Sequence, residues 1–106
     1  MIDLFNYRRR SSSPVQVGNI QLGGDAPIRI QSMTTTNTND TAACVEQAER
    51  IIKAGGELVR LTTQGRREAE NLKNINAQLR ADGFDTPLVA DVHFNANVAD
   101  VAALYA

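Results

Sequence analysis

Residues 58–93 read LVRLTTQGRREAENLKNINAQLRADGFDTPLVADVH, and this stretch decides the fold class. Two apolar runs, at 58–63 and 87–93, flank a segment in which apolar side chains recur at helical spacing: Ala69, Leu72, Ile75 and Leu79. The spacing predicts a strand, an amphipathic helix and a second strand. Gly83 follows the last apolar position, where glycine commonly ends a helix. Strands joined through a helix run parallel, so the stretch predicts a right-handed, parallel βαβ unit.

The alternation of strand and helix extends towards the N-terminus. Residues 28–33 predict a strand, and a stretch without apolar residues follows it from 34 to 39. Asn39 or Asp40 is the candidate N-cap of a helix, whose apolar residues share one face: Cys44, Val45, Ala48, Ile51 and Ile52. Further upstream, apolar and polar residues alternate on both sides of Gly18-Asn19. This predicts a β-hairpin, because Gly and Asn tolerate the positive φ of a tight turn.

Towards the C-terminus the pattern stops inside a third helix. Asn95 or Asn97 is its candidate N-cap, and its apolar pattern continues to the last residue. We therefore expect an α/β fold, with a β-hairpin followed by three βα units. An open doubly wound sheet and part of a TIM-type (β/α)₈ barrel both fit this order. A whole barrel takes about 250 residues, so we expect residues 15–106 to be a partial barrel, truncated in the third helix.

Composition excludes several classes of function. The net charge is −1, which argues against nucleic-acid binding, and residues 1–14 are expected to be a flexible terminus rich in Arg and Ser. No apolar run approaches the ~20 residues of a membrane span, so no membrane partner is expected. The single cysteine, Cys44, cannot form an internal disulfide and is typical of a reducing compartment. These features predict a cytoplasmic protein. Cys44 lies on the apolar face of its predicted helix and is therefore expected to be a core residue.

Polar side chains gather at the predicted strands, whose carboxyl ends carry the sites of parallel α/β proteins. Arg60 interrupts an apolar strand, and we expect it to be buried, which requires an anion. That anion is either a phosphate or carboxylate of a ligand, or Asp91 in a structural ion pair. Asp91 and His93 share one side of their strand, and His93 is either a structural residue or part of the site. The first strand adds Gln31. One His and one Asp do not complete a coordination sphere, so no metal site is expected.

Three motifs resemble the 4-hydroxy-3-methylbut-2-en-1-yl diphosphate synthase family. They are APIRIQSMT at 26–34, LVR at 58–60 and PLVADVHF at 87–94. The stretch from 59 to 69 is more similar to the longer, three-domain form of the family than to the two-domain form. The resemblance implies a TIM-type barrel that binds a cyclic diphosphate, and a 4Fe–4S cluster held in a C-terminal domain outside this segment.

The resemblance also implies an activity and partners. The family reductively converts 2-C-methyl-D-erythritol 2,4-cyclodiphosphate to 4-hydroxy-3-methylbut-2-enyl diphosphate in isoprenoid biosynthesis, with electrons from flavodoxin or ferredoxin. Position in the motifs implies that Arg60 binds the diphosphate and that Gln31, Asp91 and His93 line the substrate pocket. No catalytic residue is expected in this segment, so the 106-residue chain alone should be inactive. The alternative is a small, self-sufficient α/β domain that binds a phosphate ligand or a partner.

Open sheet edges predict self-association of the isolated chain. In a sheet of three strands, the first and third each keep one unpaired edge. The inner face of a partial barrel, on which we expect Val59, Leu61 and Val89, is uncovered as well. The isolated chain is therefore expected either to be marginally stable or to self-associate.

Overall fold

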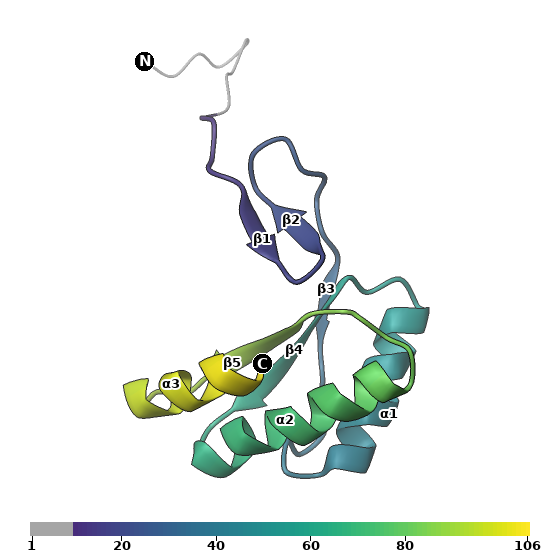
Figure 1. The fold of residues 1–106 in the computed structure, drawn as a ribbon, viewed down its shortest axis with the longest axis vertical. Coiled ribbons are helices and arrows are strands. Elements are labelled where there is room, and N and C mark those ends of the chain that lie inside the picture. The colour runs from purple at the N-terminus through teal and green to yellow at the C-terminus, as the bar shows by residue number, and fades with distance from the viewer. Residues whose placement is uncertain (1–9) are drawn as a thin grey trace.

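The structure is a computed structural model, which describes residues 10–106 of the chain. Its elements follow in the order β1 (Val15–Val17), β2 (Ile20–Leu22), β3 (Gln31–Met33), α1 (Thr41–Lys53), β4 (Leu58–Thr63), α2 (Arg66–Ala81), β5 (Leu88–Val92) and α3 (Ala96–Tyr105) (Figure 1). The predicted hairpin and three βα units are confirmed. The predicted flexible terminus at 1–14 lies mostly outside the described residues. Among the described helices, none is long and apolar enough to cross a membrane.

The hairpin forms as predicted and packs at the amino end of the sheet. Gly18, between β1 and β2, has φ +55°, a left-handed conformation that glycine adopts without strain. A Cβ on Gly18 would lie 3.0 Å from Cγ of Pro87. The Asn19 side chain donates a hydrogen bond to the Asp85 carboxylate at 2.9 Å. Pro87 and Asp85 immediately precede β5, so the hairpin leaves the carboxyl ends of the strands free.

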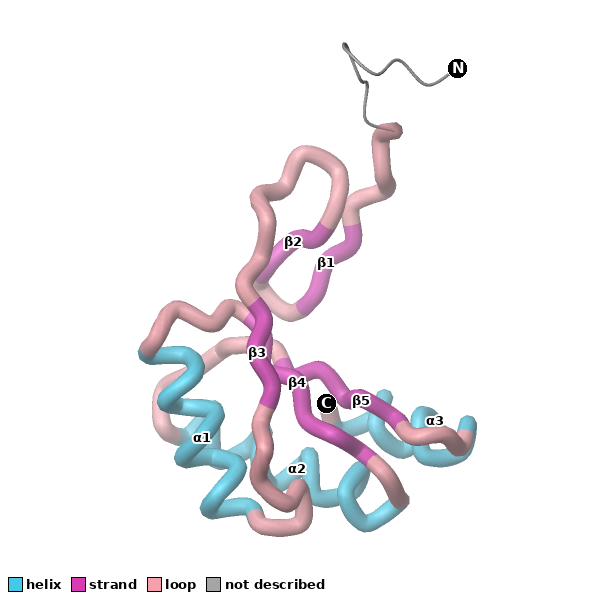
Figure 2. The backbone as a smooth tube through the Cα atoms, turned by 180° about the vertical axis from the view of Figure 1, so that it is seen from behind, coloured by secondary structure: helices cyan, strands magenta, loops and turns pink. Residues whose placement is uncertain are grey.

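The three remaining strands form a parallel sheet in the order β3-β4-β5. All three helices lie on one face of this sheet, and within the described residues the opposite face carries no helix (Figures 1 and 2). The register aligns Arg60 with Met33 on one side and with Val89 on the other, and aligns Thr62 with Asp91. β3 and β5 are the two edges, as the sequence predicted.

The first strand of this sheet is shorter than the predicted 28–33. β3 begins only at Gln31, and Ile28 is 92% exposed. In the residues before it, the Arg29 guanidinium donates to the backbone oxygen of Gln21 at 3.1 Å and to the Glu57 carboxylate at 2.9 Å. Contacts with the hairpin and with the turn before β4 therefore hold this segment, in place of a regular strand ladder.

The core lies between the sheet and the helices. The predicted inward positions of α2 are all fully buried: Ala69, Leu72, Ile75 and Leu79. Asp40 is the N-cap of α1, and its side chain accepts a hydrogen bond from the backbone N–H of Ala43. Asn95 is the N-cap of α3 and accepts one from the backbone N–H of Asn97. The inner sheet face was predicted to carry Val59, Leu61 and Val89. This is wrong for Val59 and Leu61, because both are fully buried in the core on the helix side, whereas Val89 is in register with Arg60. Strand alternation then leaves Arg60 and Thr62 on the open face.

Candidate functional site

Three predicted site residues meet on the open face of the sheet. The Arg60 Nε atom lies 3.8 Å from Oδ2 of Asp91, and Nε2 of His93 lies 3.1 Å from Oδ1 of the same carboxylate. Arg60 comes from β4, and Asp91 and His93 come from β5 and the residue that follows it. The carboxylate thus lies between the two basic side chains. We call these residues the Arg60–Asp91–His93 cluster.

The prediction that Arg60 is buried is wrong, because its side chain is 38% exposed. The open face has no covering layer within the described residues, so the guanidinium reaches solvent. Its Nε is nevertheless shielded and has no hydrogen-bond partner within the described residues, since 3.8 Å to Asp91 exceeds a hydrogen bond. Its Nη groups make one hydrogen bond to another described residue, from Nη2 to the Met33 sulfur, so they remain available for an additional anion. The structural pair with Asp91 and a ligand-binding role are compatible.

Two neighbours of the cluster were not predicted as contacts. Met33 in β3 places its sulfur 3.3 Å from Nη2 of Arg60, a weak acceptor that the parallel register brings alongside. Phe94 stacks on His93 with ring centroids 4.8 Å apart and an interplanar angle of 10°. Phe94 is itself 96% exposed. The sequence motif contained both residues, but only the strand register and the turn after β5 show what they contact.

Gln31 lies on the same sheet but not in the cluster. It is the first residue of β3 and pairs in register with Leu58, not with Arg60. No hydrogen bond joins the Gln31 side chain to another described residue. It therefore lies towards the amino end of β3, two positions before the Arg60 level, exposed on the open side. The structure brings together three of the four predicted site residues.

A polar loop follows β3 and lies above the carboxyl end of the sheet. The Thr38 hydroxyl donates to the backbone oxygen of Thr62 at 2.6 Å. The Asn71 side chain, from α2, donates to the backbone oxygen of Thr38 at 2.8 Å and accepts from the Thr41 hydroxyl at 3.1 Å. Beside this loop is a cavity of about 350 Å³, lined by Thr36, Asn37, Thr38, Asn39, Thr62, Gln64 and Glu68. We call it the loop cavity.

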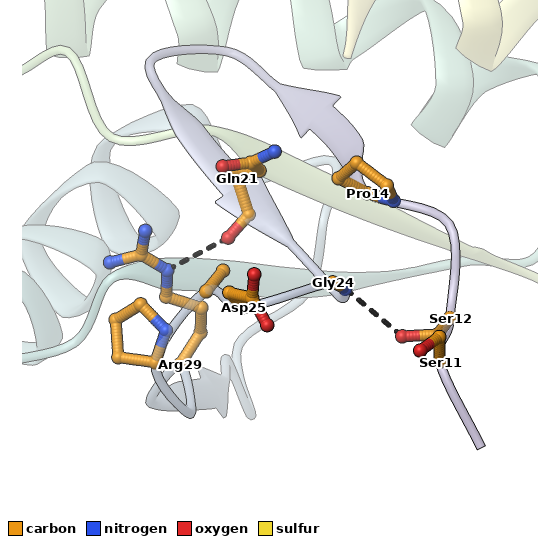
Figure 3. Close-up of a pocket in the computed structure, with 9 residues that line it drawn as sticks. Ser11, Ser12, Pro14, Gln21, Gly24, Asp25 and Arg29 are labelled. Atoms are coloured by element: carbon orange, nitrogen blue, oxygen red, sulfur yellow. Dashed lines mark hydrogen bonds between the residues drawn. The ribbon is translucent and has the colours of Figure 1, made fainter.

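A larger cavity, of about 590 Å³, lies beside the hairpin, at the opposite end from the cluster. Arg29 is the one cation among its described lining residues, and its guanidinium is already bonded to Gln21 and Glu57. Figure 3 shows the bond to Gln21 and the bond from the Gly24 backbone N–H to the Ser12 hydroxyl. Since its cation and its glycine N–H are occupied, this cavity is a poor candidate for an anion site.

Cys44 is fully buried, as predicted for a core residue. Burial raises the pKa of its thiol, the hydrogen bond with Thr36 opposes that rise, and the nearby Asp40 carboxylate adds to it. The sulfur lies 3.2 Å from the Thr36 hydroxyl and from the backbone oxygen of Asn37. Within residues 10–106, no three His, Cys, Asp or Glu side chains gather as metal ligands. The described residues therefore do not fit an iron–sulfur cluster, which needs several thiolates.

Comparison with known proteins relates this geometry to a family. The GcpE TIM-barrel domain family matches residues 12–106. The flavodoxin-type 4-hydroxy-3-methylbut-2-en-1-yl diphosphate synthase of Phocaeicola vulgatus is 74% identical over 105 residues, which is 99% of this chain and 17% of the relative. The chain belongs to the GcpE family. The domain of this family is named a TIM barrel, which agrees with the parallel three-strand sheet and its helices.

Other relatives of the GcpE family carry the same name. The synthase of Bacteroides thetaiotaomicron is 69% identical over 105 residues, which cover 99% of this chain and 17% of that protein. The synthase of Chlorobaculum tepidum is 56% identical over 96 residues, which cover 91% of this chain and 13% of the relative. The chain thus spans about a sixth of the length of these relatives, and the predicted family and fold are confirmed.

Proposed function

We propose that residues 15–106 form the first part of the barrel in an isoprenoid-pathway oxidoreductase, a 4-hydroxy-3-methylbut-2-en-1-yl diphosphate synthase. In this proposal the segment binds 2-C-methyl-D-erythritol 2,4-cyclodiphosphate, and Arg60 holds its diphosphate. Family membership favours this function over a small, self-sufficient phosphate-binding domain. The observation that carries it is an arginine on the open sheet face, beside Asp91 and His93, whose Nη groups bond no oxygen of another described residue.

Arg60 is suited to a diphosphate by chemistry and by placement. A guanidinium offers five N–H donors in a planar fork that matches phosphate oxygens. Among the described residues it has one weak sulfur contact and a carboxylate beyond hydrogen-bond distance. A diphosphate can therefore gain contacts with Arg60 without breaking a strong bond. Further cations elsewhere in the full-length protein would complete the neutralisation of its charge.

Asp91 and His93 are proposed to position and complement that arginine. The Asp91 carboxylate attracts the guanidinium and accepts a hydrogen bond from the imidazole when Nε2 carries the proton. Holding both basic groups from one carboxylate fixes their relative orientation. The other imidazole nitrogen can then face the ligand. Gln31, the first residue of β3, is proposed to line the substrate pocket nearer the amino end of that strand.

The redox part of the reaction lies outside these residues. A 4Fe–4S cluster would supply electrons for the reductive opening of the ring, but this segment holds no set of ligands for one. The names of the relatives favour flavodoxin as the electron donor. The single cysteine supports a cytoplasmic location, where such an enzyme would work.

A chimaeric enzyme tests the proposal. Residues 1–106 would replace the matching segment of the Phocaeicola vulgatus synthase, and Arg60→Ala would be compared with Arg50→Ala, an exposed arginine on α1. Losing a charge-assisted phosphate contact should raise KM about ten- to a hundredfold, while Arg50→Ala should leave it unchanged. Equal kinetics for Arg60→Ala and the parent chimaera would refute the assignment.

A further inference from the structure

We propose that the loop cavity binds the uncharged, hydroxyl-bearing part of the ligand whose phosphate Arg60 holds. This inference rests on the function proposed above. It adds that the phosphate and the hydroxyl-bearing part of the ligand bind at two different places. The described residues that line the loop cavity, of about 350 Å³, all carry hydroxyl, amide or carboxylate side chains: Thr36, Asn37, Thr38, Asn39, Thr62, Gln64 and Glu68. Neutral hydroxyl groups are the ligand chemistry that such a lining recognises.

The loop walls of the cavity are fixed by internal hydrogen bonds. Thr38 is held by β4 and by α2, through the backbone oxygen of Thr62 at 2.6 Å and the side chain of Asn71 at 2.8 Å. The Asn39 amide donates to Oε1 of Glu68 at 3.1 Å. Because these groups hydrogen-bond to each other, their orientations are fixed before a ligand binds. The loop is thus preorganised, which lowers the entropy cost of binding.

Glycine at position 65 is part of this arrangement. Gly65 is the N-cap of α2, and a Cβ added to it would lie 2.9 Å from Oε2 of Glu68. Glu68 thus folds back over the start of its own helix, where a negative charge is favourable. The carboxylate is held against α2 and linked to the loop through Asn39.

Two free side-chain groups of the loop cavity are neutral. No hydrogen bond to another described residue occupies the Thr62 hydroxyl or the Gln64 amide. Both residues come from β4 and the turn that follows it. A hydroxyl and a primary amide together supply donors and acceptors. They can therefore pair with hydroxyl groups of a ligand, which also donate and accept.

Charge keeps phosphate groups out of the loop cavity. Among the described residues that line it, Glu68 is the one charged side chain, and none is a cation. A phosphate placed there would face a fixed carboxylate without compensation. Arg60 supplies that compensation on the open face nearby. The two places therefore select different parts of one ligand.

The strand register brings one lining residue of the loop cavity, Thr62, close to the Arg60–Asp91–His93 cluster. Thr62 lies two residues beyond Arg60 on the same face of β4, a separation of about 7 Å at ~3.3 Å per residue. Thr62 also pairs in register with Asp91. A small phosphorylated polyol can therefore reach from the Arg60 guanidinium to the Thr62 hydroxyl.

The affinities of two ligands for the same chimaera test whether the phosphate and the hydroxyl-bearing part bind at different places. Isothermal titration would measure the affinities of inorganic pyrophosphate and of 2-C-methyl-D-erythritol 2,4-cyclodiphosphate. Thr62→Val and Gln64→Leu should each weaken the cyclic diphosphate about two- to tenfold, the usual effect of losing a neutral hydrogen bond. Pyrophosphate, which has no carbon skeleton, should keep its affinity. Gln78→Leu, at an exposed glutamine of α2, is the matched control and should change neither affinity.

The ratio of the two affinities separates the outcomes. Thr62→Ser retains the hydroxyl and should restore the parent ratio, whereas a damaged fold would weaken both ligands together. An unchanged ratio in both Thr62→Val and Gln64→Leu would overturn the role of the loop cavity. Pyrophosphate binding that is insensitive to Arg60→Ala would instead contradict the function proposed for Arg60.

Discussion

The Arg60 Nε atom lies 3.8 Å from Oδ2 of Asp91, across two adjacent parallel strands. That distance allows attraction but no direct hydrogen bond, so the pair orients the guanidinium without occupying its donors. A closer, bidentate pair would make Arg60 a structural residue. The observed geometry leaves the arginine poised for a second anion, and this distinction underlies the predictions for the site.

Lysine at position 60 should not replace arginine fully. Arg60→Lys keeps the charge but removes the planar fork that pairs with two phosphate oxygens. We expect an affinity for the cyclic diphosphate between those of the parent and Arg60→Ala, measured by titration of the chimaera. Full affinity in Arg60→Lys would show that only the charge matters and would contradict the bidentate contact.

The isolated chain should bind no iron–sulfur cluster. Cys44 is its one cysteine and is buried, and a cluster requires several thiolates. After anaerobic reconstitution of the 106-residue chain, the absorbance of sulfur-to-iron charge transfer should be absent. The chimaera, reconstituted in parallel, is the positive control. A stoichiometric cluster on the monomeric chain would contradict the role of Cys44 as a core residue.

Cys44 should react slowly with alkylating reagents in the native state. Burial raises the pKa of its thiol, so less reactive thiolate is present at pH 8 than in the unfolded chain. Because the folded-state pKa is the higher one, the free energy of unfolding should fall as the pH rises through the ordinary thiol range and towards the folded-state pKa. Iodoacetamide rates with and without denaturant measure the first effect. Equal rates would mean that Cys44 is accessible.

Leu72 and Leu104 form a matched pair for testing the core. Leu72 is fully buried in the core and Leu104 is 75% exposed. Leu72→Ala should lower the free energy of unfolding by about 2–5 kcal/mol, whereas Leu104→Ala should change it by less than about 0.5 kcal/mol. Urea unfolding of the chimaera or of the isolated chain gives both values. Similar losses for the two variants would contradict the placement of the core.

The isolated chain should be marginally stable or self-associate. β3 and β5 are open edges, and large apolar side chains are exposed next to them: Ile28, Ile30, Met33 and Phe94. Open edges and apolar patches promote association between chains. Light scattering over a range of concentrations should show particles that grow with concentration. If the chain stays monomeric, urea unfolding should instead show a shallow transition. A monomer that unfolds cooperatively at every concentration would contradict this prediction.

Local patterns predicted most of the fold. Leu72 and Ile75 lie at helical spacing, Asp40 is a side chain that caps helices, and Gly18 tolerates a tight turn, so each residue carries its own signal. The length of β3 was not predictable in this way, because Arg29 bonds to Gln21 in the hairpin and to Glu57, which is distant in sequence. The face of Val59 and Leu61 was misassigned, although alternation with Arg60 placed them on the helix side.

The site was only partly predictable from the sequence. Strand ends selected Arg60, Asp91 and His93, because parallel strands bring their carboxyl ends to one edge. The exposure of Arg60 was not predictable, since it depends on what covers the opposite sheet face. The loop cavity was also missed, because it depends on hydrogen bonds between the loop at 34–39 and α2, which are far apart in sequence.

A crystal structure of the chimaera with 2-C-methyl-D-erythritol 2,4-cyclodiphosphate tests the central proposal most directly. We expect phosphate oxygens within about 3 Å of the Arg60 guanidinium nitrogens, with the Asp91 carboxylate still between Arg60 and His93. A diphosphate bound elsewhere, with Arg60 bonded only to Asp91, would contradict it.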